Sequence, residues 1–93
     1  MPIPNNNHCQ EPQPTLQNLI PVAVAIACGC EPCAEATVKQ ALEKGSSKRD
    51  LEHTLRIIAY MRNLNCLNQA VGPEVIARME KPLSAAAKAL QRF

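Results

Sequence analysis

The sequence of 93 residues predicts an all-α fold, a small antiparallel helical bundle. Three observations lead to this prediction. Apolar residues recur at helical spacing in several segments, proline and glycine separate those segments, and only one short run alternates as a strand would. A chain of this length forms one domain around one core. We therefore expect an extended polar arm over residues 1–14 and a single helical domain over residues 15–93.

The first predicted helix spans residues 15–27, and Thr15 is placed to cap its N-terminus. Pro21 lacks an amide donor and should bend this helix or restart it. The second half of the segment is also compatible with a short strand, because three of its apolar residues alternate: Val22, Val24 and Ile26. No second strand-like run exists to pair with it, which favours the helix.

The second predicted helix runs from Pro32 to Lys44. Proline suits the first turn of a helix, where the amide hydrogen that it lacks would have no partner. Gly45 suits the position after the helix, where the backbone often turns left-handed. The apolar residues of this helix fall on one face: Ala34, Val38, Ala41 and Leu42.

The longest predicted helix covers residues 48–65 and begins with a capping box. Ser47 is the N-cap, and Asp50 is the acid three residues later. Four positions follow in helical register: Leu51, Leu55, Ile58 and Met61 or Arg62. We expect this helix and the one before it to form an antiparallel hairpin.

Two further helices complete the prediction. Gly72 and Pro73 break the chain and begin a short helix that ends near Met79. Pro82 breaks the chain again, and the last helix follows in the segment LSAAAKALQRF. One face of that helix carries Leu83, Ala87 and Leu90.

The expected core is made of small side chains. Alanine is abundant, whereas Tyr60 and Phe93 are the only aromatic residues. Alanine lets helices approach closely, but it buries little area, and each Å² of apolar surface removed from water contributes roughly 25 cal/mol. We therefore expect copies of the chain to associate and so bury more surface.

Charge and hydropathy exclude several classes of partner. A net charge of +2 without a basic stripe, and with almost no aromatic residues, argues against nucleic-acid binding. The apolar run at residues 19–27 is far shorter than the roughly 20 residues of a membrane-spanning helix. The first residues lack the features of a secretion signal, and five cysteines do not suit a secreted disulfide scaffold. We expect a cytoplasmic protein without a cofactor or membrane contact.

Three of the five cysteines lie in the segment CGCEPC, in which Cys30 just precedes the second helix and Cys33 falls in its first turn. Free amides and the helix dipole at such a place lower the pKa of a thiol, and the thiolate is the reactive form. Residues three apart across a helix start can also come within disulfide distance. Cys30 and Cys33 are therefore predicted to be a redox pair.

The same segment allows other interpretations. A soft ion such as zinc, copper(I) or arsenite could bind its three thiols: Cys28, Cys30 and Cys33. The candidates for a fourth ligand are Cys9, His8 and Cys66. The chain has neither a second CxxC nor a histidine pair at ligand spacing, so this metal site is the alternative. If Cys28 and Cys66 neither react nor bind a metal, we expect them to be small residues packed against their neighbours.

The run VAVAIACGCEPCAEATVKQALEKGSSKRDLEHTLRIIAYM resembles the carboxymuconolactone decarboxylase family and, within it, the alkylhydroperoxidase-D-like branch. The matching features are an apolar helix before the CxxC, a helix ending in KGSS and the capped helix RDLEHTLRIIAYM, and they cover residues 16–64. The resemblance implies an all-α protein that assembles into trimers or hexamers. It also implies that the CxxC is a thiol–disulfide centre that reduces peroxides.

The sequence departs from this branch at two positions. The branch has a histidine four residues after the second cysteine, where Thr37 stands, and a glutamate about twelve residues before the first, where Asn18 stands. In the branch these two groups relay a proton that activates a thiol. Threonine can hydrogen-bond a sulfur but cannot act as a base near neutral pH.

We therefore expect a catalytic group of Cys30 and Cys33, the redox pair, with Thr37 as a hydrogen-bond donor to a sulfur. We expect it to exchange electrons with a thiol or disulfide partner, with weak or no peroxidase activity. The remaining alternative is an oligomeric family member that has kept the fold without the catalysis.

Overall fold

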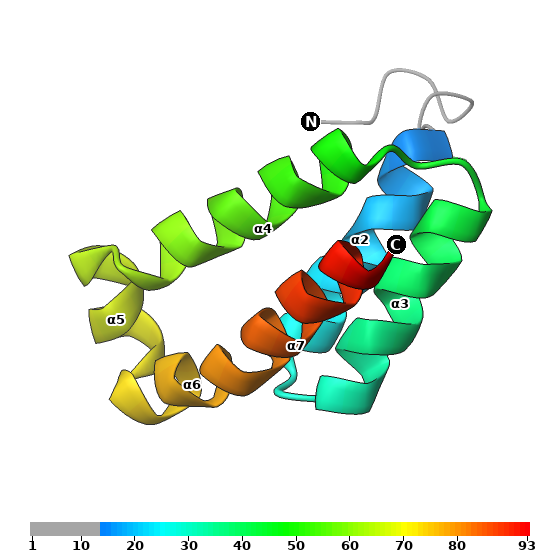
Figure 1. The fold of residues 1–93 in the computed structure, drawn as a ribbon. Coiled ribbons are helices and arrows are strands. Elements are labelled where there is room, and N and C mark those ends of the chain that lie inside the picture. The colour runs from blue at the N-terminus through cyan, green and yellow to red at the C-terminus, as the bar shows by residue number, and fades with distance from the viewer. Residues whose placement is uncertain (1–13) are drawn as a thin grey trace, which may run out of the picture.

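The computed structural model describes residues 14–93, which form helices joined by short turns (Figure 1). In chain order these are α2 (Pro14–Ala27), α3 (Glu31–Glu43), α4 (Lys48–Arg62), α5 (Asn65–Val71), α6 (Pro73–Arg78) and α7 (Glu80–Arg92). The all-α prediction is confirmed. The predicted N-terminal arm lies outside the described residues except for Pro14, which begins α2. None of the helices in residues 14–93 combines the length and the apolar character that a bilayer crossing requires.

Helix α2 is continuous through Pro21, so the strand alternative for its second half is wrong. Helix α3 begins one residue before Pro32 and ends at Glu43, with Lys44 as its C-cap. The prediction for this helix is confirmed to within one residue at each end. Helix α3 has the bounds that Pro32 and Gly45 indicate, because these residues act on the backbone next to them. Helix α2 begins at Pro14, so Thr15 lies inside the helix and the prediction that it caps the N-terminus is wrong.

The predicted helix over residues 48–65 is wrong at its C-terminal end, where the structure has two helices. Helix α4 ends at Arg62, and the separate helix α5 begins at Asn65. Two asparagine side chains satisfy carbonyl groups at this junction. The Asn63 amide donates to Ala59 O at 3.0 Å, and the Asn68 amide donates to the carbonyls of Arg62 and Leu64, each at 2.9 Å. Asparagine competes for backbone partners in this way at helix ends, and the apolar periodicity does not reveal it.

The predicted break at Pro82 is also wrong. Helix α6 ends at Arg78 and α7 begins at Glu80, so the break lies at Met79 and Pro82 is the third residue of α7. The backbone amides in the first turn of a helix have no carbonyl acceptor within the helix, so a proline, which lacks the amide hydrogen, is tolerated there. Pro82 is buried and forms part of the face that α7 turns toward the rest of the chain.

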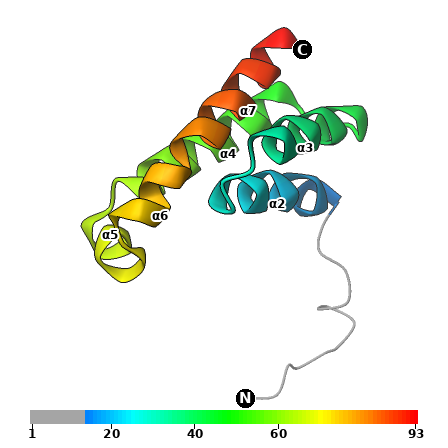
Figure 2. The ribbon, with the colours of Figure 1, turned by 90° about the horizontal axis from the view of Figure 1, so that it is seen from below.

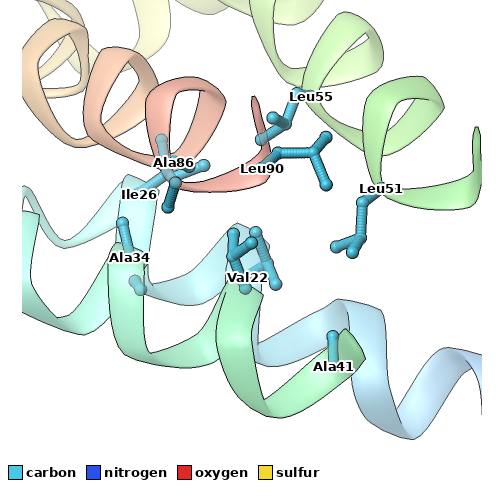
Figure 3. Close-up of a cluster of buried hydrophobic side chains, with 11 residues drawn as sticks. Val22, Ile26, Ala34, Ala41, Leu51, Leu55, Ala86 and Leu90 are labelled. Carbon is cyan, nitrogen blue, oxygen red and sulfur yellow. The ribbon is translucent and has the colours of Figure 1, made fainter. Parts of the chain in front are cut away.

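The predicted hairpin of α3 with α4 is wrong. Helix α3 packs against α2 and α7, whereas α4 diverges from α3 and packs mainly against α7 and α2 (Figures 1 and 2). The reason lies in the buried side chains. Leu51 and Leu55 of α4 lie beside Leu90 of α7 in the shared core (Figure 3). Helix α3 instead offers small residues that let α2 and α7 approach closely.

The core lies where α2, α3, α4 and α7 meet, and α5 lies at the end of the molecule away from α2 and α3 (Figures 1 and 2). Its buried members are Val22, Ala25, Ile26, Ala34, Val38, Ala41, Leu51, Leu55, Ala86, Ala89 and Leu90. Alanine supplies five of these eleven side chains, so the expectation of a core built from small residues is confirmed.

Candidate functional site

The turn between α2 and α3 positions the cysteines. Helix α2 ends at Ala27, and the turn that follows contains Gly29, whose φ of 78° lies in the left-handed region that favours glycine. The amides of Gly29 and Cys30 donate back to Ile26 O at 3.0 Å and Ala25 O at 3.1 Å. This pair of hydrogen bonds is a Schellman motif. It satisfies carbonyl groups that the end of α2 would otherwise leave without a partner. The chain therefore leaves α2 in a defined direction directly at Cys30.

Cys30 is also the N-cap of α3. Its backbone is extended, and its Sγ accepts a hydrogen bond from the amide of Cys33 at 3.2 Å. Pro32 occupies the second position of the helix and restricts the backbone between the two cysteines. Cys30 thus serves two helices at once, because its amide closes α2 and its sulfur caps α3.

Cys30 and Cys33 form a disulfide, with an S–S distance of 2.01 Å and a Cα–Cα distance of 5.2 Å. The expectation that these two side chains lie close enough to join is therefore met. The two residues differ in accessibility, since Cys33 is exposed and Cys30 is half-buried. An exposed disulfide at a helix N-terminus is open to thiol–disulfide exchange, in which a thiolate attacks one of the two sulfurs.

Thr37 does not make the hydrogen bond to sulfur that the sequence suggested. Its hydroxyl donates to the backbone carbonyls of Cys33 at 2.9 Å and Ala34 at 3.0 Å, so its single hydrogen is shared within α3. Threonine commonly bonds to its own helix in this way. A catalytic role for Thr37 stays a prediction, and the disulfide state described here gives it a structural role.

The other two described cysteines are free thiols. Cys28 directly follows α2 and Cys66 lies in α5, and both are exposed. The interpretation of these two residues as packed side chains is therefore wrong. Cys28 escapes burial because it lies beyond the inward-facing Ala25 and Ile26, and Cys66 because α5 contributes no buried residue. Cys9 and His8 lie outside the described residues.

The three-thiol metal site is not assembled in the described part of the chain. Over residues 14–93, no group of three histidine, cysteine or acidic side chains is arranged to hold a metal ion. The sulfurs of Cys30 and Cys33 are bonded to each other, which leaves only the Cys28 thiol of the three proposed ligands.

Residues from the junction of α6 and α7 lie beside the cysteine turn, and sequence reasoning missed them. A hollow of about 350 Å³ is lined by Gly29, Glu31, Ala77, Arg78, Glu80 and Lys81. A Cβ atom added at Gly29 would lie 3.5 Å from Arg78 O, so the turn and the end of α6 are in close contact. The turn and the end of α6 are far apart in the sequence, so the sequence pattern does not reveal their contact. The glycine in CGC is the one local feature that indicates a close approach.

The acidic face of α3 turns toward α7. An open cleft of about 520 Å³ lies between these helices and is lined by Glu31, Glu35, Ala85, Lys88, Gln91 and Arg92. One ion pair crosses it, from Arg92 Nη2 to Glu35 Oε2 at 3.7 Å, with both side chains largely exposed. A second hollow, between α4 and α7, is lined in part by Glu52 and by no residue of the CGCEPC segment.

Comparison with known proteins adds one match. The sequence model of the carboxymuconolactone decarboxylase family matches residues 13–73, a range that includes α2 to α5 and the Cys30–Cys33 pair. Neither the comparison with curated proteins nor the comparison with solved structures found a match.

Proposed function

This chain belongs to the carboxymuconolactone decarboxylase family, and from that premise we propose that it is a thiol–disulfide oxidoreductase of the alkylhydroperoxidase-D-like branch. The observation that carries the proposal is the accessible disulfide between Cys30 and Cys33 at the start of α3. A thiol donor transfers two electrons to this disulfide, and the resulting dithiol passes them to an acceptor disulfide.

Peroxide is the weaker acceptor in this proposal. Reduction of a peroxide needs a thiolate and a proton for the leaving oxygen, and a positioned base or acid accelerates proton transfer by roughly 10² to 10⁴. Thr37 stands where the branch has its histidine, and its hydroxyl is bonded to backbone carbonyls. We therefore expect slow peroxide consumption beside efficient exchange between thiols and disulfides.

The proposal is tested by the rate at which the full chain accelerates electron transfer from dithiothreitol to glutathione disulfide. Cys30→Ser and Cys33→Ser should each reduce this acceleration to the uncatalysed rate, because one sulfur cannot close the cycle. Cys66→Ser, which removes an exposed free thiol on α5, is the matched control and should keep the full rate. Full activity in the Cys30→Ser/Cys33→Ser double variant would refute the proposal, and a wild-type chain inactive with every thiol donor would point to a non-catalytic family member.

A substitution in α3 tests the assignment to the branch. Thr37→His places an imidazole four residues after Cys33, on the same face of the helix. If the missing base limits peroxide reduction, this variant should consume hydrogen peroxide faster than wild type, on the order of 100-fold. Thr37→Val, which removes the hydroxyl without adding a base, is the control. Equal rates in all three proteins would contradict the proposed reason for weak peroxidase activity.

The proposal includes self-association through α2. This helix contains no charged residue, and three of its large apolar side chains, spaced four apart on one face, are about half exposed: Leu16 (47%), Ile20 (49%) and Val24 (53%). An uncharged face can pair with a copy of itself without repulsion between like charges. The small core gives a second reason, because burying this face adds the apolar contact that alanine does not supply. Trimers or hexamers are the assemblies that the resemblance to the branch implies.

Light scattering coupled to gel filtration tests the self-association. Ile20→Glu and Val24→Glu place a charge in the exposed stripe of α2 and should lower the mass to that of a single chain. Gln40→Glu adds the same charge at an exposed position of α3 and should leave the mass unchanged. A wild-type chain that already elutes with the mass of one chain would exclude this part of the proposal.

A further inference from the structure

Helices α3 and α7 lie side by side (Figures 1 and 2), and two hollows lie along their contact. The first is the open cleft of about 520 Å³ described above, and the second has a volume of about 490 Å³. Glu35 and Arg92 line both hollows, so the hollows adjoin at the 3.7 Å contact between these two side chains. Together they form one groove, which we call the α3–α7 groove.

The two walls of the first hollow carry opposite charges. Glu31 and Glu35 come from α3, where a spacing of four residues places them on one face. Lys88 and Arg92 come from α7, on the other side. Within residues 14–93, neither Glu31 nor Lys88 makes an ion pair. The Glu35–Arg92 pair is largely exposed, at 48% and 64%, and such a pair contributes little to stability. A ligand from solvent can therefore engage both walls.

The second hollow is mainly apolar. Pro32 and Ala36 line it from α3, and Ala89 and Phe93 line it from the end of α7. Ala89 is buried, whereas the Phe93 side chain is 52% exposed and is open to contact by a further apolar group. Lys39 is the one charged residue that lines this hollow and not the first. An aromatic or large aliphatic group can pack here against the Phe93 ring.

We propose that the α3–α7 groove binds a free α-amino acid with a large apolar side chain. The ammonium group of this ligand pairs with Glu31 and Glu35. Its carboxylate pairs with Lys88 and Arg92. Its side chain extends from the same carbon atom into the second hollow, against Phe93. This binding function goes beyond the oxidoreductase function and is independent of it, because no cysteine of the described residues lines either hollow.

Charge and size favour this class of ligand over others. Each hollow has the volume of an ordinary small-molecule site, a few hundred Å³. A carboxylate without an amino group would lie beside two glutamates of like charge, and an amine without a carboxylate would lie beside Lys88 and Arg92. An uncharged apolar molecule would displace water from both walls without replacing its hydrogen bonds. A zwitterion satisfies both walls at once.

The first test titrates four small molecules into the full chain, with the backbone amide NMR signals as the readout. L-Phenylalanine carries all three recognised groups, and we expect a dissociation constant on the order of 1 mM, because the groove is open to solvent. Phenethylamine lacks the carboxylate, phenylpropionate lacks the ammonium group and glycine lacks the side chain. Each of these three should bind roughly tenfold more weakly or worse, since a lost charged hydrogen bond or a lost phenyl contact costs about that factor.

The signals that phenylalanine shifts should come from the facing sides of α3 and α7. Three outcomes would overturn the proposal: no saturable shift with phenylalanine, equal affinity for all four molecules, or shifts confined to the other helices.

The second test uses substitutions at exposed positions in the two walls. Lys88→Gln should weaken phenylalanine binding by roughly tenfold but should not weaken phenethylamine binding, because phenethylamine has no carboxylate to pair with Lys88. Glu31→Gln should weaken phenylalanine binding by a similar factor but should not weaken phenylpropionate binding. Glu43→Gln, at an exposed position of α3 outside both hollows, is the matched control and should change nothing. Equal losses for phenylalanine and for the molecule without the partner group would overturn the assignment of the walls.

The outcomes also separate this inference from the proposed function. If phenylalanine binds with this selectivity while wild type fails to accelerate electron transfer from dithiothreitol to glutathione disulfide, the binding site stands and the oxidoreductase function fails. If wild type is active in that assay and phenylalanine does not bind, only the binding site is wrong.

Discussion

Helices α3 and α4 begin in the same way but carry different chemistry. In each, the N-cap side chain accepts a hydrogen bond from the amide three residues later, at 3.2 Å from Cys33 N to Cys30 Sγ and at 3.0 Å from Asp50 N to Ser47 Oγ. The Ser47 hydroxyl can only cap. The Cys30 sulfur caps and also bonds covalently to Cys33. The candidate redox site is therefore an ordinary helix start in which the capping atom can be oxidised.

The turns that lead into the two starts differ by one residue. Gly29 and Gly45 both have a positive φ, and the residue after each donates its amide back to the preceding helix. After Gly45, Ser46 makes that backbone bond and Ser47 is the cap. After Gly29, Cys30 does both. The shorter turn holds the Cys30 sulfur between two helices, so the position of this sulfur is determined from both sides.

The largest expected effect comes from introducing a second cysteine pair at the start of α4. Ser47→Cys/Asp50→Cys places two thiols at the positions that Cys30 and Cys33 occupy in α3, and we expect them to close into a disulfide because the cap geometry is shared. Oxidised protein should lose two titratable thiols, and peptide mapping should locate the bridge. Lys48→Cys/Asp50→Cys, with the spacing changed by one, should stay reduced. A transplanted pair that remains open would show that Pro32 or the shorter turn is required.

A smaller effect should follow from reducing the native disulfide. The bond closes a loop of residues only three apart in sequence, and loop-entropy arguments give roughly 2 kcal/mol for such a short loop. Dithiothreitol should therefore lower the free energy of unfolding of wild type by about 2 kcal/mol or less in urea titrations, since the Cys30 sulfur can still cap α3 after reduction. The Cys30→Ser/Cys33→Ser variant is the control and should not respond to dithiothreitol. A loss well above this value would mean that the bridge holds together more than the first turn of α3.

The smallest effect separates the two capping atoms. Ser47→Ala should cost about 1 kcal/mol of stability, the usual value for loss of an N-cap, and Ser47→Thr should restore most of it. Under reducing conditions at low pH, Cys30→Ala should cost less than Ser47→Ala, because a neutral thiol is a weak acceptor. Cys30→Ser should be at least as stable as reduced wild type. Equal costs of the two alanine substitutions in chemical denaturation would contradict this difference between sulfur and oxygen.

Local signals predicted the starts of α3, α4 and α6 and the proximity of Cys30 to Cys33. The Ser47 cap, the positive φ of Gly45 and the place of Pro32 in α3 all follow from residues within a few positions of each other. Interactions between residues close in the chain also bring Cys30 and Cys33 together, because both lie at the start of one helix and its geometry determines their separation. The end of α4 was harder to predict, because the Asn68 side chain reaches back to Arg62 O across the junction.

The arrangement of the helices was not predictable in this way. We expected α3 to pair with α4 because they are neighbours in the chain, but α3 packs against α2 and α7. Apolar periodicity shows that Val38 or Leu51 faces a core without showing which helix lies opposite. The exposure of Cys28 and Cys66 had the same cause, since it depends on what the other helices leave uncovered.

The amino-acid sequence by itself thus determined where most helices begin and end and that two thiols meet at the start of one of them. These features depend on hydrogen bonds and backbone angles between residues close in the chain. Only the tertiary structure decided that α7 lies across α3, that the end of α6 lies against Gly29, and that Cys33 is exposed while Cys30 is half-buried. Those outcomes depend on how small side chains from distant segments fit together, and such contacts leave no periodic signal in the sequence.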